Sequence, residues 1–363
     1  MEGGIAPPAP SPAALHVAIM AGGRGERFWP LSTPEAPKQF LALAGPGGAT
    51  LLQQAVARAE ALVPWDRRLV VAGRAHAGLV RGQLPELPPH NVILEPAGRD
   101  TAGAIALACA WAARRDPAAR LLVMPADHAV PDAAAFRRAV GAGLRVLDAH
   151  PEALVTLGMG PTRPETGYGY IQVGDPVPGA PGTAWARRFT EKPDLPAAER
   201  FLREGGYRWN SGIFLWTLAA IRERLREHLP AHAALVDRLC GLEEPAWPAA
   251  LEAEFPRLPK ISIDYGVMEK ASQVAVVLAD FAWDDLGAWS ALPRVHPANG
   301  RGNVVQGPAR LVDVEDCIVV SSGRPIGAVG LRGLVVVEGP GGVLVCPRER
   351  AQDVRRVAEG TTG

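Results

Sequence analysis

Short apolar runs that alternate with alanine-rich stretches constrain the fold of this 363-residue chain more than any other feature. The first third of the chain is expected to contain strands near His16, at 68–72, near Val92 and near Leu121, with helices at 51–62, around Ala77 and at 101–113. This alternation predicts βαβ units and therefore a mostly parallel sheet covered by helices. Ligands of such sheets bind beyond the carboxyl ends of the strands, where the polar motifs of this chain fall.

A glycine-rich segment, MAGGRGERFWPLSTPEAPKQF at 20–40, follows the first predicted strand. Its early glycines lack side chains, so backbone amides can approach an anion closely, as they do in phosphate sites. Arg24 and Arg27 add guanidinium groups that suit phosphate oxygens, and Lys38 can reach the same place if 30–37 forms a bend. The segment therefore predicts a site for a nucleoside triphosphate.

Two familiar phosphate-binding loops do not fit this segment. A dinucleotide-binding fingerprint that starts at Gly23 needs glycine at position 28, where Phe28 stands, and no GKS or GKT follows as a P-loop requires. Lysine usage gives a second clue, because only four of the 38 basic residues are lysines. Lys38 and Lys192 lie in the motif-like segments PKQF and FTEKPD and are candidates for phosphate contacts, whereas solvated charges would explain the other two lysines.

Composition limits the compartment and the classes of partner. The formal net charge is zero and the sequence pI is about 7.1, so a broad surface for nucleic acid or an anionic membrane is not expected. No apolar run reaches the roughly 18 residues that a membrane-spanning helix needs. Since no CxxC pair occurs, we expect a cytoplasmic protein whose cysteines are buried thiols of a reducing compartment. These cysteines are Cys109, Cys240, Cys317 and Cys346.

The texture of the sequence divides the chain into three expected parts. Residues 1–15 are rich in proline and alanine and predict a flexible tail. Residues 16–298 carry the βαβ pattern and most of the motifs. Residues 299–363 change to short β-rich pieces separated by glycine and proline, which predict a small β domain or a few coils of a β-solenoid, with a terminal helix at 348–358.

Carboxylates follow two of the strand-like runs. Asp127 comes just past a buried strand in LLVMPADHAV, and Asp284 and Asp285 follow the run at 274–278 in FAWDDLGAW. Two carboxylates that converge from distant strands could hold a divalent metal such as Mg²⁺ that bridges phosphate oxygens. A helix cap or a turn is the alternative role for these aspartates, and His128 is expected to make only local hydrogen bonds.

Further segments carry polar groups that suit a base or a sugar. EPAGRDTAGAI places Glu95, Arg99 and Asp100 in a loop before a helix that starts near Thr101, where donors and acceptors could read the edge of a base. TGYGYI at 166–171 and RWNSGIFLW at 208–216 mix glycines and polar groups with aromatics, which suits the hydroxyls and ring faces of a sugar. Two β-edges that pack tryptophans are the alternative explanation of the last two segments.

The order of these motifs resembles that of the sugar-nucleotide pyrophosphorylases, and most of all the mannose-1-phosphate guanylyltransferases. The segments that carry the resemblance are GGRGERFWPLSTPEAPKQF, EPAGRDTAGAI, PADH, TGYGYI, FTEKPD, WNSGIF, IDYGVMEK and WDDLGAW. The resemblance implies a doubly wound nucleotidyltransferase domain of the nucleotide-diphospho-sugar transferase type and a short left-handed β-helix at the C-terminus. It also implies a homodimer, Mg²⁺ as cofactor, and the transfer of GMP from GTP to mannose 1-phosphate.

The resemblance implies site residues in four groups. The triphosphate would be held by Gly22, Gly23, Gly25, Arg27 and Lys38. The guanosine side would contact Glu95, Arg99, Asp100 and Thr101. Mannose 1-phosphate would contact Gly167, Glu191, Lys192 and Asn210. Asp127 and Asp285 would bind Mg²⁺, and Arg27, Lys38 and Lys192 would be the catalytic cations.

Some residues depart from the pattern of the family, and alternatives stay open. Glu26 stands where threonine is common, Arg24 where serine is frequent, Asp100 where asparagine is usual and Gly103 where proline is frequent. An acidic Glu26 near phosphates would be repelled unless it points away or pairs with an arginine. The alternative functions are a pyrophosphorylase for another pair, such as glucose 1-phosphate with UTP or dTTP, and a catalytically silent nucleotide-sugar-binding regulatory subunit.

Overall fold

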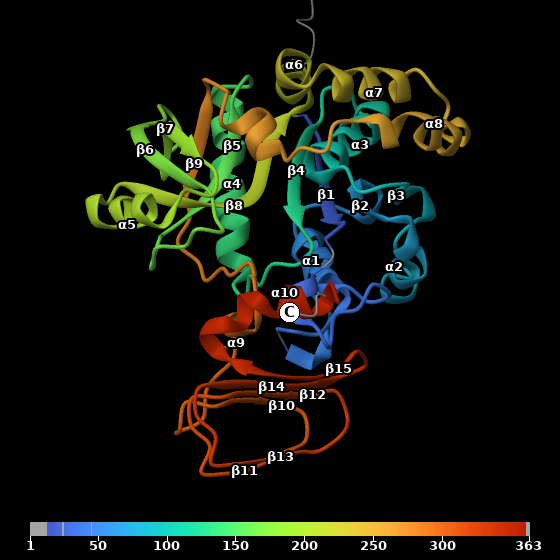
Figure 1. Ribbon diagram of the computed structural model, residues 1–363. Helices are drawn as coiled ribbons and strands as arrows, with labels where there is room; N and C mark the ends of the chain where they lie inside the picture. Colours follow the sequence, from blue (N-terminus) through green and yellow to red (C-terminus); the bar gives the residue numbers. More distant parts are fainter. Residues whose placement is uncertain (1–12, 24, 45, 361–363) are drawn as a thin grey trace, which may run out of the picture.

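The computed structural model describes residues 13–23, 25–44 and 46–360 (Figure 1). Most of the expected tail at 1–15 lies outside these residues, as does Arg24. The described part consists of a large sheet with helices on both of its faces and a smaller β-rich unit formed by the C-terminal strands. Within it, no helix is both long enough and apolar enough to span a membrane.

Within the described residues, the large sheet has nine strands, whose order differs from their order along the chain. From one edge to the other they are β3 (Val92–Glu95), β2 (Arg68–Gly73), β1 (Leu15–Ala21), β4 (Arg120–Pro125), β8 (Tyr207–Thr217), β5 (Leu154–Met159), β9 (Val274–Leu278), β7 (Thr183–Thr190) and β6 (Tyr170–Pro176). The first four pair in parallel, β8 runs antiparallel to its neighbours β4 and β5, and β5 pairs in parallel with β9. The sheet is therefore mixed, as expected.

The register of two central strands brings two motifs to one edge of the sheet. Met20 of β1 pairs with Pro125 of β4 in a parallel ladder. Gly22 and Asp127 each lie two residues further along, beyond the carboxyl ends of the strands.

The segment RWNSGIFLW lies in β8, a central strand of the sheet, and its Trp209 pairs with Tyr170 of β6. RWNSGIFLW is thus not a β-edge, which overturns the edge explanation for that segment.

Helices cover both faces of this sheet (Figure 1). They are α1 (Leu51–Glu60), α2 (Ala77–Gln83), α3 (Asp100–Arg115), α4 (Ala133–Ala149), α5 (Leu195–Glu204), α6 (Leu218–His228), α7 (Pro230–Cys240) and α8 (Trp247–Glu254). One buried core joins the sheet to α3, α6, α7 and α8, and a second joins it to α1, α2, α4 and α5. Because strand side chains alternate between faces, Ala18 packs in the first core and Val17 in the second.

The C-terminal strands form a coiled β unit. The strands β10 (Val304–Gln306), β12 (Ile318–Ser321), β14 (Leu334–Gly339) and β15 (Gly342–Pro347) make one sheet, and β11 (Ala309–Val312) pairs in parallel with β13 (Ile326–Val329). The short helix α9 (Leu292–Val295) precedes this unit. Its end differs from the single helix expected at 348–358, since 3-10 turns at Arg348–Asp353 come before α10 (Val354–Ala358).

A third buried core fastens the C-terminal unit to the glycine-rich segment. Phe28 and Leu43 pack there with Trp289, and with Ile318 and Val335 of the β unit. The β unit thus lies against the segment that follows β1, and α10 lies close to it (Figure 1).

The four cysteines are all free thiols, but only Cys109 and Cys317 are buried as expected. Cys240 and Cys346 are partly exposed, because both lie near the ends of surface elements.

Candidate active site

The bend expected at 30–37 does return Lys38 to the glycine-rich segment. Gly25 has a φ of 64°, and a Cβ atom added there would lie 2.3 Å from Cβ of Lys38, so only glycine fits. The side chain of Gln39 fastens the segment further, since its Nε2 donates to the carbonyl oxygens of Ala21 at 2.8 Å and Gly23 at 2.9 Å. The PKQF motif therefore holds Lys38 against the glycine-rich segment.

Lys38 connects the two aspartates that the sequence singles out. Its Nζ lies 2.9 Å from Oδ2 of Asp127 and also donates to the backbone carbonyl of Asp285. The lysine is buried, with 5% of its surface exposed. Burial alone would raise the pKa of Asp127, but the charge of Lys38 and its hydrogen bond hold that pKa below its usual value. Asp127 is therefore an ionised carboxylate at neutral pH.

A cavity of about 300 Å³ contains this centre. Its lining residues come from the glycine-rich segment, from the loops after β4 and β9, and from the C-terminal helix. They are Gly25, Glu26, Arg27, Phe28, Lys38, Asp127, His128, Asp285, Leu286, Gly287 and Arg355. Arg27 is exposed at the cavity. The described structure therefore brings Gly25, Arg27, Lys38, Asp127 and Asp285 together, whereas Gly22 and Gly23 lie in the exposed loop just after β1.

Arg355 is a cation of this cavity that the sequence did not reveal. It lies on α10, and its Nε is 3.3 Å from Oε2 of Glu26 and 2.8 Å from Oε1 of Glu359. Of the two alternatives given for Glu26, pointing away or pairing with an arginine, the structure shows the pairing, with a residue 329 positions away in the chain. The pair places the C-terminal helix beside the predicted triphosphate site.

The neighbours of the two metal-candidate aspartates have structural partners of their own. His128 accepts a hydrogen bond from Nε1 of Trp283 on Nδ1 at 3.2 Å, so this partner lies 155 positions away in the chain and is not the local one expected. Burial lowers the pKa of His128. Asp284 is buried and forms a two-point ion pair with Arg294, while its Oδ1 accepts from the amide of Leu286 at 2.8 Å. Of the acidic pair, only Asp285 lines the cavity.

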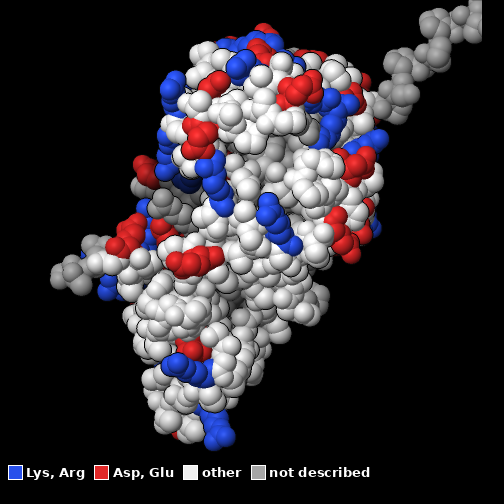
Figure 2. Space-filling model, turned by 90° about the vertical axis from the view of Figure 1, so that its right-hand side faces the viewer, with Lys and Arg blue, Asp and Glu red and all other residues white. Residues whose placement is uncertain are grey.

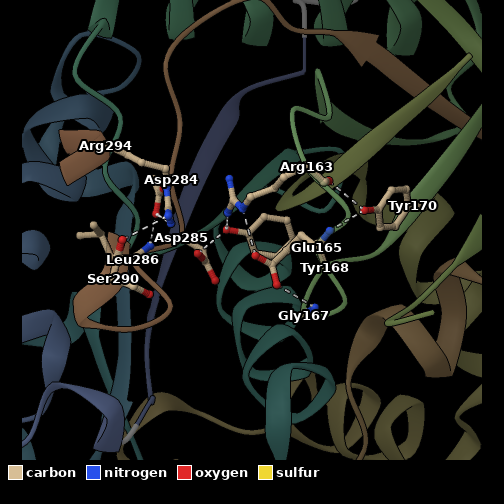
Figure 3. A network of polar contacts seen from close by, with 10 residues as sticks. All are labelled: Arg163, Glu165, Gly167, Tyr168, Tyr170, Asp284, Asp285, Leu286, Ser290 and Arg294. Atoms are coloured by element: carbon tan, nitrogen blue, oxygen red, sulfur yellow. Dashed lines mark hydrogen bonds and ion pairs between the residues drawn. The ribbon is translucent and has the colours of Figure 1, made fainter. Parts of the chain in front are cut away.

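Tyr168 links Asp285 to the TGYGYI segment (Figure 3). Its hydroxyl donates to Oδ1 of Asp285 and accepts from Nη2 of Arg163 at 3.3 Å. Arg163 is held in turn by Glu165, whose Oε2 lies 3.2 Å from its Nε. Gly167 donates its amide to Oε1 of the same glutamate at 3.2 Å. The sugar-type motif and the metal-type motif therefore belong to one polar network.

The predicted base-reading loop contains one buried carboxyl group without a protein partner. Glu95 ends β3, is 7% exposed, and has no hydrogen-bond or ion-pair partner among the described residues. Burial, and then the charge of Asp100, raise the pKa of Glu95 to about 7. A Cβ atom added to Gly22 would lie 3.0 Å from Oε2 of this glutamate, so Gly22 keeps the space above it open.

The other residues of this loop form hydrogen bonds within the protein. Arg99 donates to the carbonyl of Pro256, and Oγ1 of Thr101 accepts from the amide of Ile263 at 2.8 Å. Asp100 has a φ of 61°, and its Oδ1 accepts from the amide of Thr101 at 2.8 Å at the start of α3. Arg99 and Thr101 thus fasten the segment around the IDYGVMEK motif to α3.

The sugar-type residues gather around a buried acid that the sequence did not identify, Asp264. Its Oδ1 accepts from Nδ2 of Asn210 at 2.7 Å, and burial raises its pKa. Burial, and then the charge of Asp264, raise the pKa of Glu191 to about 7, although Lys192 lies 3.2 Å from Oε1 of Glu191. For Lys192, burial would lower the pKa, but Glu191 raises it.

A glycine of TGYGYI makes room for this group. A Cβ atom added to Gly169 would lie 2.4 Å from Oε2 of Glu191, and Oε2 has no hydrogen-bond partner among the described residues. Gly169, rather than Gly167, is the glycine in contact with the carboxyl group. Lys192 itself is half exposed and has a φ of 45°. The structure thus places Glu191, Lys192 and Asn210 around Asp264, with Gly167 on the neighbouring loop.

Two family models match the chain and together cover most of it. Residues 16–300 match the model described as nucleotidyl transferase, and residues 307–360 match the one described as MannoseP isomerase/GMP-like beta-helix domain. The predicted α/β fold with a C-terminal β-helix-like unit is confirmed by these matches and by the arrangement of strands.

Curated relatives and a solved structure match more than nine tenths of this chain. ManC of Salmonella typhimurium, named mannose-1-phosphate guanylyltransferase, is 39% identical over 355 residues, which cover 95% of this chain and 72% of the relative. XanB of Xanthomonas campestris pv. campestris, named a xanthan biosynthesis protein, is 41% identical over 353 residues, or 93% of this chain and 71% of the relative. A crystal structure from Thermus thermophilus, described as a mannose-1-phosphate geranyltransferase, has a TM-score of 0.86 and 41% identity, and the match covers 95% and 98% of the two chains.

Proposed function

The chain belongs to the nucleotidyl transferase family, among the relatives of the mannose-1-phosphate guanylyltransferases, and on this premise we propose that it transfers GMP from GTP to α-D-mannose 1-phosphate, forming GDP-mannose and pyrophosphate. The observation that carries the proposal is the meeting of Lys38, Asp127 and Asp285 in one cavity beside the glycine-rich segment. Cations and carboxylates that converge in this way suit a triphosphate with a divalent metal.

The residues at this centre fit Mg²⁺. Asp127 and Asp285 line the same cavity, and oxygen ligands are those that Mg²⁺ prefers. Among the described residues no group of three or more metal-binding side chains occurs. A site with two carboxylates is typical of Mg²⁺ that takes its remaining ligands from substrate phosphates and water. Bound there, Mg²⁺ would neutralise charge on the triphosphate during the reaction.

The reaction we propose needs cations more than it needs a base. A sugar 1-phosphate has a second pKa near 6, so at pH 7 it is mostly a nucleophilic dianion. Its oxygen attacks the α-phosphorus of GTP in line, a new P–O bond forms, and the bond to the leaving pyrophosphate breaks. Arg27 and Lys38 offset charge at the triphosphate, and Lys192 does so at the sugar phosphate. Catalysis then rests on positioning and electrostatics.

Each substrate has a proposed set of contacts. Glu95 would accept hydrogen bonds from the guanine edge, whose exocyclic amino group is a donor. Arg99, Asp100 and Thr101 would shape that side of the site, because they hold the loop and the start of α3 together. Glu191 and Asn210 would bind mannose hydroxyls, with Gly167 at the edge. The glycines at 22, 23 and 25 would let the backbone approach the phosphates.

The direct test of the proposal is product formation. Purified protein with GTP, mannose 1-phosphate and Mg²⁺ should yield GDP-mannose and pyrophosphate in equal amounts, and a chelator should stop the reaction. Retention of activity after exhaustive chelation would remove Mg²⁺ from the proposal. Formation of a different nucleotide sugar in preference to GDP-mannose would overturn the substrate assignment.

We also propose that the chain forms a homodimer through its β unit. Several valines there are exposed by half or more of their surface, namely Val312, Val329, Val343 and Val345. Figure 2 shows a large uncharged area on the lower part of the molecule, whereas charges of both signs are mixed over the upper part. Val343→Glu combined with Val345→Glu should halve the mass measured by sedimentation. An unchanged mass would remove this interface, and Val357→Glu on α10 is the control.

A further inference from the structure

A second cavity borders the segments that carry Asp127 and Asp285. Its volume is about 600 Å³, twice that of the cavity around Lys38, and none of the residues proposed above to bind substrate lines it. Its walls come from α1, from the loop after Asp127, from the end of β5, and from the residues just before Asp285. Ala129 and Asp284, which belong to two of these walls, form an antiparallel bridge.

A buried cation without an acidic partner lines this cavity. Arg58 of α1 is 6% exposed, and the hydrogen bond that it makes runs from Nη2 to the carbonyl oxygen of His128 at 3.3 Å. No carboxylate among the described residues forms an ion pair with it. Removing a guanidinium group from water is costly unless an anion or several acceptors compensate it. A buried arginine of this kind is explained if an anion binds beside it.

The rest of the lining is suited to an anion that carries a flat or apolar group. Arg163 and Arg294 add two guanidinium groups, against the single carboxylate of Asp284. The indoles of Trp209 and Trp283 and the ring of Phe281 supply apolar surface. Arg163 already lies over the ring of Trp209, with its Cζ 5.0 Å from the ring centre. A volume of about 600 Å³ is far larger than a bare phosphate ion needs.

We propose that this cavity is a second ligand site, for an organic phosphate whose anionic group binds Arg58 and whose flat part lies against Trp283 and Phe281. A nucleotide is the class of molecule with both features. The site is separate from the one proposed for the substrates, because the loop after Asp127 and the residues before Asp285 form its wall.

A ligand here would act on the proposed active site through Arg163 and Arg294 (Figure 3). Arg163 donates to the hydroxyl of Tyr168, which holds Asp285, and Arg294 holds Asp284 next to it. An anion that attracts both arginines competes with these contacts and loosens the segment that carries Asp285. Binding should therefore inhibit the enzyme, a consequence that rests on the proposed function, whereas the binding itself does not.

Calorimetric titration with GDP in the absence of metal tests the site. The full chain should bind two molecules of GDP, one in each cavity. Ala57 is exposed on α1 and lines the second cavity, so Ala57→Glu should repel the anion without disturbing the core and reduce the count to one. Ala57→Lys is the matched control for size and should keep two. The Arg58→Met variant should also bind one molecule of GDP. It should stay folded, because the substitution removes a buried charge that no carboxylate compensates.

The outcomes separate this proposal from the proposed function. One site that Ala57→Glu leaves intact would overturn the second site. One site that Ala57→Glu removes would support the second site and argue against the nucleotide site beside Glu95. Inorganic phosphate should displace GDP from the second site only at concentrations at least about tenfold higher than GDP itself needs. Equal potency would overturn the organic-phosphate assignment.

Discussion

The ammonium group of Lys38 lies 2.9 Å from Oδ2 of Asp127, although 89 positions separate the two residues in the chain. The same group donates to the backbone of Asp285, so one buried cation joins three segments of the sheet domain. The charge of Lys38 keeps Asp127 ionised, and its ammonium group holds the backbone of Asp285 close to Asp127. In the proposed reaction, this centre receives the triphosphate and its metal.

Replacing Lys38 with methionine should abolish most of the activity. The variant keeps the length of the side chain but removes the charge that offsets the triphosphate and holds Asp127. We expect kcat to fall by roughly 10²-fold or more, by analogy with the loss of one donor from an oxyanion hole. Lys270→Met, at an exposed lysine, is the control and should leave kcat unchanged. A Lys38→Met enzyme within a few fold of the parent would contradict the role of this centre.

Lys192→Ala tests the sugar-phosphate side. Lys192 is half exposed and paired with Glu191, so its loss should cost little stability. Its loss should nevertheless raise KM for mannose 1-phosphate and lower kcat by roughly 10²-fold, because a dianion would then approach the triphosphate without its cation. Steady-state kinetics with Lys260→Ala as the control measure the effect. Turnover within a factor of about three of the parent's would show that the assignment of Lys192 is wrong.

Glu95 should make GTP binding dependent on pH. Its pKa of about 7 means that the carboxylate able to accept from guanine forms as the pH rises through 7. GTP affinity, measured without the sugar phosphate so that Glu191 does not contribute, should increase from pH 6 to pH 8. Glu95→Gln should bind GTP more weakly at pH 8 and lose this dependence. A pH dependence that survives in Glu95→Gln would assign it to another group.

The raised pKa of Glu95 also makes the stability of the ligand-free protein depend on pH. Because the folded pKa of Glu95 lies above the ordinary value of 4.5, the folded state binds the proton more tightly than the unfolded state does. This contribution to stability is complete below pH 4.5 and is lost as the pH rises through 7. Glu95→Gln should therefore gain unfolding free energy relative to the parent at pH 8, and less at pH 5, in denaturant titrations.

The ion pair between Glu26 and Arg355 should affect the KM for GTP more than it affects the stability of the protein. Arg355→Gln leaves the carboxylate of Glu26 at the cavity without this cation, so KM for GTP should rise several fold while kcat changes little. The double variant Glu26→Gln/Arg355→Gln should recover most of the loss, since both charges are then absent. Arg356→Gln, at the exposed neighbouring position, is the control. No recovery in the double variant would show that Arg355 acts on the phosphates rather than through Glu26.

The sequence allowed the sheet, its first βαβ units and the return of Lys38 to be predicted, because each depends on local patterns. Gly25 and the prolines of 30–37 indicate a tight bend. The apolar run at 274–278 coincides with β9. Asp127 and Asp285 could be predicted to converge because each follows a strand-like run, and the carboxyl ends of parallel strands share one edge.

The remaining features depend on contacts between distant parts of the chain, which no local pattern reports. The antiparallel insertion of β8 between β4 and β5 decides that Asn210 is buried against Asp264. Arg355 reaches Glu26 only because the C-terminal unit packs on the glycine-rich segment. Asp264 was visible within IDYGVMEK, but nothing in its neighbours distinguishes a buried acid from an exposed one. The solvent exposure of Cys240 and Cys346 is likewise set by packing.

The measurement that tests the central claim most directly is pyrophosphate release from the purified chain with Mg²⁺. Each of the four nucleoside triphosphates is combined in turn with mannose 1-phosphate and with glucose 1-phosphate. Release confined to GTP with mannose 1-phosphate is the predicted result. Preference for glucose 1-phosphate with UTP or dTTP would contradict the substrate assignment, and no release from any pair by folded protein would contradict catalysis itself and favour a nucleotide-sugar-binding regulatory subunit.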